Sequence, residues 1–151
     1  MTAQPQWIEA GPENVATLTP VFDAYRQFYE QATDTGLAER YLHDRLSHRE
    51  SRIWFTVCEE TQETLAFAQV YPTFCSVRAD SVWVLYDLFV VPQARGRGLA
   101  RRLLEHVHTM AALSEIREIS LTTARTNSAA QALYESLGYR RDDVFLRYVR
   151  E

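Results

Sequence analysis

Residues 87–102 limit the possible folds of this chain more than any other segment. They read as a buried strand that ends at Pro92, a turn with two glycines, and an amphipathic helix that begins at once. Glycines let backbone N–H groups approach a ligand closely, and a helix N-terminus adds unpaired donors and partial positive charge. With four arginines inside residues 95–102, the segment predicts a loop that binds a phosphate-containing ligand.

Two well-known phosphate loops do not fit this segment. The dinucleotide fingerprint G-x-G-x-x-G/A requires Gly or Ala where Arg101 stands. The Walker loop requires a lysine, and all sixteen basic residues of this chain are arginines. Neither a Rossmann dehydrogenase nor a P-loop NTPase is therefore predicted.

The remaining sequence changes its hydrophobic period from helical to strand-like and back. Helices are predicted over residues 11–31, 37–47, 99–110 and 127–137, with Gly138 as a left-handed cap of the last. Strands are predicted over residues 6–10, 53–58, 65–77, 82–91 and 119–124, around Tyr139, and over 144–149. With 151 residues and 46% hydrophobic composition, the chain is expected to be one α/β domain over 1–151. Its sheet is expected to be mixed and mostly antiparallel, with a central parallel β-α-β unit and about four flanking helices.

Several classes of function are disfavoured. No apolar run approaches the roughly 20 residues of a membrane span, and residues 1–6 lack a signal-peptide layout, so a soluble cytoplasmic protein is expected. Cys58 and Cys75 stand far from any C-x-x-C spacing and are expected to be buried reduced thiols. No histidine pair has i, i+4 spacing, so no metal is predicted. No basic strip interleaved with aromatic residues suggests nucleic-acid binding.

Two motifs together resemble one known family. Gln93-Ala94-Arg95-Gly96-Arg97-Gly98 matches the [QR]-x-x-G-x-[GA] signature of the GNAT superfamily of acetyl-coenzyme A-dependent N-acetyltransferases. Asn127-x-x-Ala130-x-x-Leu133-Tyr134-Glu135-x-x-Gly138-Tyr139 is similar to the second motif of that family. Within it, the chain looks most similar to the polyamine (spermidine/spermine) acetyltransferases and their histone-acetyltransferase-like relatives.

The resemblance implies a GNAT fold, acetyl-CoA as co-substrate, and a set of cofactor-binding residues. The pyrophosphate would lie on residues 95–101, and the strand backbone of residues 88–90 would pair with the pantetheine arm and offer a donor to the thioester carbonyl. The implied cofactor-binding residues are Leu88, Phe89, Val90, Arg95, Gly96, Arg97, Gly98, Leu99, Ala100, Arg101, Asn127, Ala130 and Tyr134.

Tyr134 is the residue that the resemblance implies as proton donor to the departing thiolate. A phenol with a pKa near 10 suits this role, although Tyr134 also falls on an apolar helical stripe and could pack in the core. Asn127 could likewise be a helix N-cap, and that role is compatible with contact to the cofactor.

The attacking amine must lose a proton before it can attack, since an alkylammonium has a pKa of about 10.4. In the polyamine branch a glutamate precedes the residue that matches Asp87, and Tyr86 stands there in this chain. Asp87 could act directly, through water, or only as a cation anchor. Tyr29, Tyr71 and Tyr86 could line the same acceptor site. Because strand side chains alternate, Tyr86 and Asp87 can face the amine together only across a bulge.

The charges support a cationic acceptor. Residues 1–90 hold 13 acids and 6 arginines, for a net charge of −7, whereas residues 91–151 hold 7 acids and 10 arginines, for +3. We expect direct acetyl transfer to a polyamine or other small cationic amine, then to a lysine side chain or protein N-terminus, then to an amine drug or amino acid. The alternative is a catalytically silent acyl-CoA-binding regulatory module. A homodimer formed through the last strands is also expected.

Overall fold

A five-stranded sheet organises the larger of two compact units in the chain. This computed structural model describes residues 4–151, divided into residues 4–121 and 122–151, which we describe separately. Neighbours in the sheet follow chain order, and every pair is antiparallel except β4 and β5, which are parallel. The strands are β1 (Ile8–Glu9), β2 (Arg52–Val57), β3 (Thr64–Cys75), β4 (Asp80–Val90) and β5 (Ile119–Ser120).

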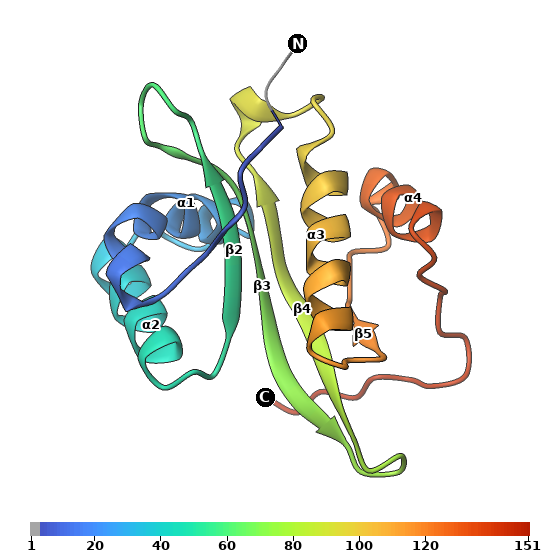
Figure 1. Cartoon of the computed structure of the whole chain (residues 1–151). Coiled ribbons are helices and arrows are strands. Elements are labelled where there is room, and N and C mark those ends of the chain that lie inside the picture. The colour runs from blue at the N-terminus through green and yellow to red at the C-terminus, as the bar shows by residue number, and fades with distance from the viewer. Residues whose placement is uncertain (1–3) are drawn as a thin grey trace. The chain divides into compact units, whose positions relative to one another are not determined.

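The helices cover both faces of this sheet. The first unit holds α1 (Val15–Phe28), α2 (Thr35–Ser47) and α3 (Leu99–Leu113), with short 3-10 turns η1 (Pro12–Asn14) and η2 (Pro92–Ala94). Figure 1 shows α1 and α2 on one side of the sheet and α3 on the other. The second unit contains α4 (Ser128–Ser136). The mixed α/β fold with four α-helices in the described residues confirms the predicted fold class, while one domain over residues 1–151 stays a prediction.

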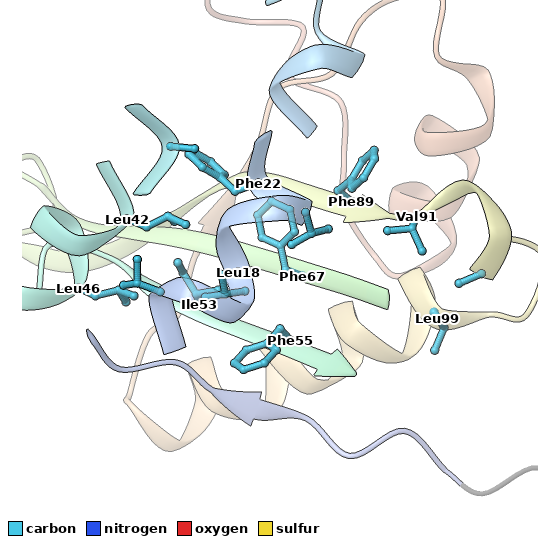
Figure 2. Close-up of a cluster of buried hydrophobic side chains, with 14 residues drawn as sticks. Leu18, Phe22, Leu42, Leu46, Ile53, Phe55, Phe67, Phe89, Val91 and Leu99 are labelled. Carbon is cyan, nitrogen blue, oxygen red and sulfur yellow. The ribbon is translucent and has the colours of Figure 1, made fainter. Parts of the chain in front are cut away.

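Strand alternation divides the buried side chains between the two faces. Ile53 and Phe55 of β2 join Leu18 and Phe22 of α1 in one hydrophobic cluster with residues of α2 (Figure 2). Trp54 lies between them in sequence and points to the opposite face, where its ring meets His106 of α3 at 6.2 Å. The helical spacing of the apolar residues in α1 is therefore what places this helix over β2 and β3.

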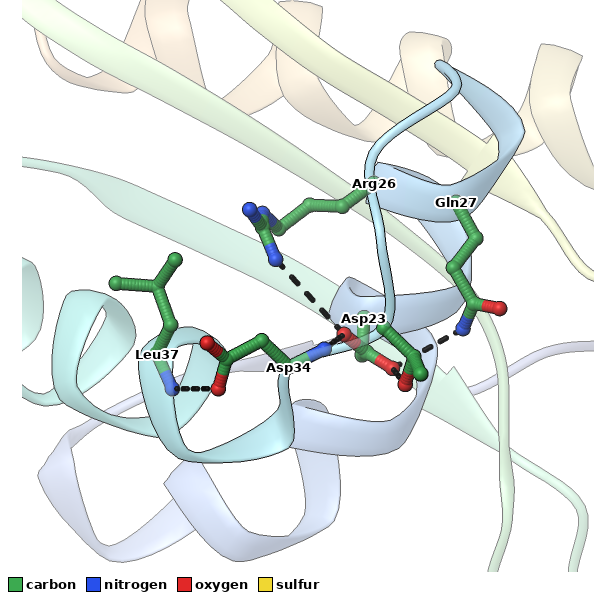
Figure 3. A network of polar contacts seen from close by, with 6 residues as sticks. Asp23, Arg26, Gln27, Asp34 and Leu37 are labelled. Atoms are coloured by element: carbon green, nitrogen blue, oxygen red, sulfur yellow. Dashed lines mark hydrogen bonds and ion pairs between the residues drawn. The ribbon is translucent and has the colours of Figure 1, made fainter.

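A buried carboxylate ties the end of α1 to the start of α2 (Figure 3). Asp23 is 4% exposed and accepts hydrogen bonds from Thr33 Oγ1 at 2.6 Å, Asp34 N at 2.9 Å and Gln27 Nε2 at 3.0 Å. Arg26 Nη1 lies 3.8 Å away. The pKa of Asp23 lies below its ordinary value, because these hydrogen bonds and the charge of Arg26 outweigh the effect of burial. This Asp23 corner fixes the path of the connection between the two helices.

Several predicted elements differ from the structure. The first helix begins as the 3-10 turn η1, and α1 ends at Phe28 rather than near residue 31. The strand predicted over residues 119–124 is only β5. The strands predicted around Tyr139 and over residues 144–149 are wrong, because a strand requires a hydrogen-bonded neighbour and the described residues after 121 form no such ladder. Val144, Phe145, Leu146 and Tyr148 are at least 80% exposed.

Candidate active site

The loop between β4 and α3 has the glycine geometry that its sequence requires. Gly96 and Gly98 have φ angles of 77° and 74°, the left-handed region that side chains disfavour. Gly98 is the N-cap of α3 and makes no side-chain capping bond, so no cap side chain covers the first N–H groups of the helix. A Cβ at Gly96 would meet nothing within 4 Å. The loop therefore presents open backbone donors at a helix N-terminus.

The arginines of this loop also brace its backbone. Arg97 Nη2 donates to the Gln93 carbonyl at 3.2 Å, and Arg102 Nη2 donates to the Arg97 carbonyl at 3.2 Å. Arg95 points back along β4, with its Nε 2.9 Å from the Val90 carbonyl. Part of the arginine cluster therefore holds the shape of the loop.

The neighbouring predicted cofactor residues differ in exposure. The guanidinium of Arg95 lies 5.6 Å and 5.5 Å from the rings of Phe28 and Phe89. Phe89 and Leu99 are buried in the core, so their side chains serve packing. Ala100 is half-buried, and Arg101 is exposed. What Leu99 can offer a ligand is its backbone N–H.

One edge of β4 carries no strand along its last residues. The parallel ladder with β5 consists of Trp83 and Val84, whereas β4 continues to Val90. Val91 N donates to the Leu65 carbonyl at 3.0 Å, so by alternation the backbone groups of Leu88 and Val90 face away from β3. Within residues 4–121 no strand pairs with them there. Within this unit, the backbone donor of Leu88 thus has no strand partner.

A β-bulge interrupts β4 where the sequence requires one. Gln69 pairs with Asp87 while Val70 pairs with Leu85, so Tyr86 is the extra residue. The rings of Tyr71 and Tyr86 meet at 5.4 Å in a T-shaped contact. The bulge thereby brings Tyr86 to the face of the sheet that carries Asp87. In a regular strand these two neighbouring side chains would point to opposite faces.

Asp87 is a buried carboxylate with few donors around it. It is 4% exposed, Gln69 Nε2 donates to its Oδ2, and the Tyr25 hydroxyl lies near it. Burial raises the pKa of Asp87, and Gln69 and Tyr25 oppose this only in part. The Tyr25 hydroxyl also lies 3.4 Å from the Tyr86 carbonyl. We call Tyr25, Gln69, Tyr71, Tyr86 and Asp87 the Asp87 cluster.

Two members of the Asp87 cluster were not predicted as site residues. Tyr25 looks like part of the apolar stripe of α1, and nothing in its spacing distinguishes it from a core aromatic. Gln69 carries a signal, because a polar residue inside the apolar run of β3 requires a buried partner. Tyr29, which was predicted, is 54% exposed and its ring packs at 5.1 Å against that of Tyr25.

The second unit holds the other predicted site residues. Asn127 is the N-cap of α4, with its Oδ1 accepting from Ala130 N at 3.2 Å, which confirms the capping role. Tyr134 is half-buried, and its ring lies 5.8 Å from that of Tyr139. Gly138 has a φ of 93°, as a left-handed cap requires.

Other predicted features can be compared with the described residues. Cys58 and Cys75 are free, as expected, but both are half-buried rather than buried, because they lie at or beyond strand ends. No group of three His, Cys, Asp or Glu side chains suited to a metal ion occurs in residues 4–151. In the same part of the chain, no helix has the length and apolar character needed to cross a membrane.

Comparisons with known proteins agree with this arrangement. The model of the acetyltransferase (GNAT) family matches residues 18–139. The Bacillus subtilis (strain 168) protein named uncharacterized N-acetyltransferase YhfO is 40% identical over 140 residues, which cover 93% of each protein. A crystal structure of a probable acetyltransferase has 33% identity and a TM-score of 0.89, with 97% of each chain covered. A Clostridium acetobutylicum structure, described as a predicted acetyltransferase with acetyl-CoA, shares the fold at 17% identity and a TM-score of 0.76, with 97% and 96% covered.

A mixed sheet with an open β4 edge beside a glycine loop is the framework of an acyl-CoA-dependent transferase. The chain belongs to the GNAT family, and it is an acetyl-CoA-dependent acetyltransferase. The residues present fit this co-substrate, because open N–H groups at the start of α3 suit a diphosphate. A free strand edge suits an extended amide-containing arm in the same way.

Proposed function

We propose that this acetyltransferase transfers the acetyl group directly to a primary amine that is cationic in solution. The proposed acceptor class is a small cationic amine or polyamine, or a lysine side chain, in line with the resemblance of the sequence to the polyamine and histone-acetyltransferase-like branch. The observation that carries this proposal is the Asp87 cluster, a buried carboxylate among tyrosines on the strand that leads into the glycine loop. The net charge of −7 over residues 1–90 gives further support.

Asp87 takes the proton of the attacking ammonium in this proposal. Its raised pKa brings the carboxyl closer to working pH, which is where a general base is most effective. Because Asp87 is 4% exposed and the Tyr25 hydroxyl lies near it, Asp87 reaches the amine through that hydroxyl or a water. Position 86 holds a tyrosine instead of the glutamate of the polyamine branch, so Asp87 is the carboxylate of the Asp87 cluster.

The remaining proposed roles concern acetyl-CoA. Residues 95–101 hold the diphosphate, the Leu88 to Val90 backbone holds the pantetheine arm, and a fixed N–H there stabilises the developing oxyanion. Asn127 and Ala130 contact the cofactor, and Tyr134 donates a proton to the departing thiolate. Acetyl-CoA supplies the activated thioester, so no covalent intermediate on Cys58 or Cys75 is needed.

Release of free CoA thiol tests the acceptor class. The chain is supplied with acetyl-CoA and a panel consisting of 1,4-diaminobutane, spermidine, a lysine-containing peptide, a neutral amino acid and an acidic amino acid. Turnover highest with the first three supports the proposal. Preference for the acidic amino acid contradicts the cationic class, and acetyl-CoA binding without turnover on any amine favours the regulatory module.

Substitution Gly98→Glu tests the loop. A side chain at this left-handed position is strained, and its carboxylate would repel the diphosphate, so acetyl-CoA affinity should fall by at least about 100-fold in calorimetry. Gly36→Glu adds the same charge near Arg40 at the start of α2 and should leave affinity unchanged. Unchanged affinity in Gly98→Glu contradicts the assignment of the diphosphate.

Substitution Tyr134→Phe tests the proposed acid. Turnover should fall by about 100-fold while acetyl-CoA affinity stays within about twofold, because only the proton to the thiolate is lost. Equal turnover would reduce Tyr134 to a packing role. Assembly as a homodimer and a cytoplasmic location remain predictions of the sequence, tested by light scattering and by cell fractionation.

A further inference from the structure

The hydroxyls of Tyr41 and Tyr71 lie 2.6 Å apart and connect α2 to β3 across 30 residues of sequence. Tyr71 belongs to the Asp87 cluster, and its ring meets that of Tyr86. Tyr41 does not belong to the cluster, and none of the roles above uses it. A short bond between partly buried hydroxyls fixes the proton of the one that donates, so the pair can control what Tyr71 offers to a ligand.

The ring of Tyr41 has two close neighbours, Phe22 and Arg45. It stacks on Phe22, with centroids 5.6 Å apart and an interplanar angle of 15°. The guanidinium of Arg45 lies 5.0 Å from the ring centroid on α2, and Arg45 Nε is 2.8 Å from Glu50. The Tyr41 hydroxyl is therefore a fixed point against which Tyr71 is oriented.

Either hydroxyl of this pair can donate to the other. Each phenol has one proton and two lone pairs, so Tyr71 can donate to Tyr41 and keep its own lone pairs for another partner. When an N–H group approaches Tyr71, this direction of the bond turns the Tyr71 proton away from it.

We propose that Tyr41 is a positioning residue that makes Tyr71 a hydrogen-bond acceptor for the substrate nitrogen, so that Tyr71 and Asp87 together select primary amines over their N-methyl counterparts. This inference rests on the proposed function, because it assumes that the amine binds at the Asp87 cluster. Tyr71 then takes one N–H of the incoming nitrogen, and Asp87 takes the other through the Tyr25 hydroxyl or a water. A methyl group in place of one N–H leaves one of these oxygens without its partner.

Kinetics of Tyr71→Phe, Tyr41→Phe and the double variant test this inference with 1,4-diaminobutane and N,N′-dimethyl-1,4-diaminobutane as acceptors. In Tyr71→Phe, KM for 1,4-diaminobutane should rise about tenfold, as expected for loss of one hydrogen bond. In Tyr41→Phe it should rise about threefold, a part of that effect. KM for acetyl-CoA should stay unchanged, and the preference for the primary amine should fall in both variants.

The double variant shows whether Tyr41 acts through Tyr71. If it does, Tyr41→Phe has no further effect once Tyr71 is Phe, whereas additive effects overturn the inference. Phe22→Leu loosens the packing under Tyr41 and keeps both hydroxyls, so it should lower thermal stability and change the amine preference less than Tyr41→Phe does. Tyr148→Phe, at an 87% exposed position, controls for hydroxyl loss alone.

The outcomes separate this inference from the proposed function. Suppose that the wild type turns over 1,4-diaminobutane but Tyr41→Phe changes neither the amine KM nor the amine preference. The role of Tyr41 is then overturned, and the proposed function stands. The same change of preference in Phe22→Leu as in Tyr41→Phe would also overturn the role of Tyr41, since packing would then suffice. If wild-type protein acetylates no amine of the panel, the proposed function fails and this inference fails with it.

Discussion

Asp23 and Asp87 are each 4% exposed, yet their surroundings give them opposite properties. The hydrogen bonds from Thr33, Asp34 and Gln27, with Arg26 nearby, lower the pKa of Asp23. Asp87 has only Gln69 and Tyr25, so burial dominates and its pKa is raised. Asp87 also lies deeper in the protein than Asp23, so burial and the number of donors both contribute: Asp23 is a structural carboxylate, and Asp87 is one able to take a proton.

The largest expected effect is the loss of stability on removing Asp23. Asp23→Ala removes the buried acceptor that binds the Thr33 hydroxyl, the Asp34 N–H and the Gln27 side chain, which should cost about 3 kcal/mol of unfolding free energy. Urea denaturation followed by circular dichroism measures this. Asp34→Ala, which removes only the exposed N-cap bond to Leu37 N, should cost about 1 kcal/mol. Equal costs would contradict the special role of the Asp23 corner.

The next effect is on rate, and only Asp87 should show it strongly. Asp87→Asn keeps the shape of the side chain but cannot take a proton, so turnover should fall about 100-fold. In the wild type the rate should rise with pH as Asp87 loses its proton, and in Asp87→Asn this rise should disappear. Asp23→Asn should retain the wild-type pH profile of the rate. A pH profile unaltered by Asp87→Asn would exclude Asp87 as the base.

The smallest effect is the pH dependence of stability, which should have opposite signs for the two aspartates. The pKa of Asp87 is raised by folding, so its contribution to stability is present below about pH 3.8 and is lost as pH rises through the raised value. Asp87→Asn should therefore melt about 4 °C above the wild type at pH 7 and lose this advantage at acid pH.

Asp23 behaves in the reverse sense. Its stabilising contribution is present above about pH 3.8 and is lost as pH falls through the lowered pKa. Asp23→Asn should melt below the wild type at pH 7, with a difference that shrinks in acid. Thermal melts of both Asn variants between pH 3 and 7 test this. Shifts of the same sign would show that burial alone governs the two sites.

The sequence predicted those parts of the site that lie close together along the chain. Glycine at positions 96 and 98 predicts a left-handed backbone, and asparagine at position 127 predicts a helix N-cap. The contacts of the Asp87 cluster join residues 18 and 61 positions apart, and the Tyr41–Tyr71 bond joins residues 30 apart. Such pairings depend on strand register and helix docking, which residue spacing alone does not specify.

The errors in the predicted fold have a similar cause. Alternating apolar residues in 144–149 satisfied a strand pattern, but pairing also requires a neighbour, and the pattern contains no information about one. The bulge in β4 was required for Tyr86 and Asp87 to share a face, yet no glycine or other local signal marks its position.

Within residues 4–121 the edge of β4 beyond Val84 has no strand partner, and this has a consequence for the protein before it binds acetyl-CoA. An open strand edge is a template for pairing with any extended backbone, including that of another polypeptide, and proteins ordinarily cover such edges. Occupancy by a ligand arm would remove this template and slow hydrogen–deuterium exchange at Leu88 and Val90. Co-substrate supply would then protect the chain from aggregation as well as enabling catalysis.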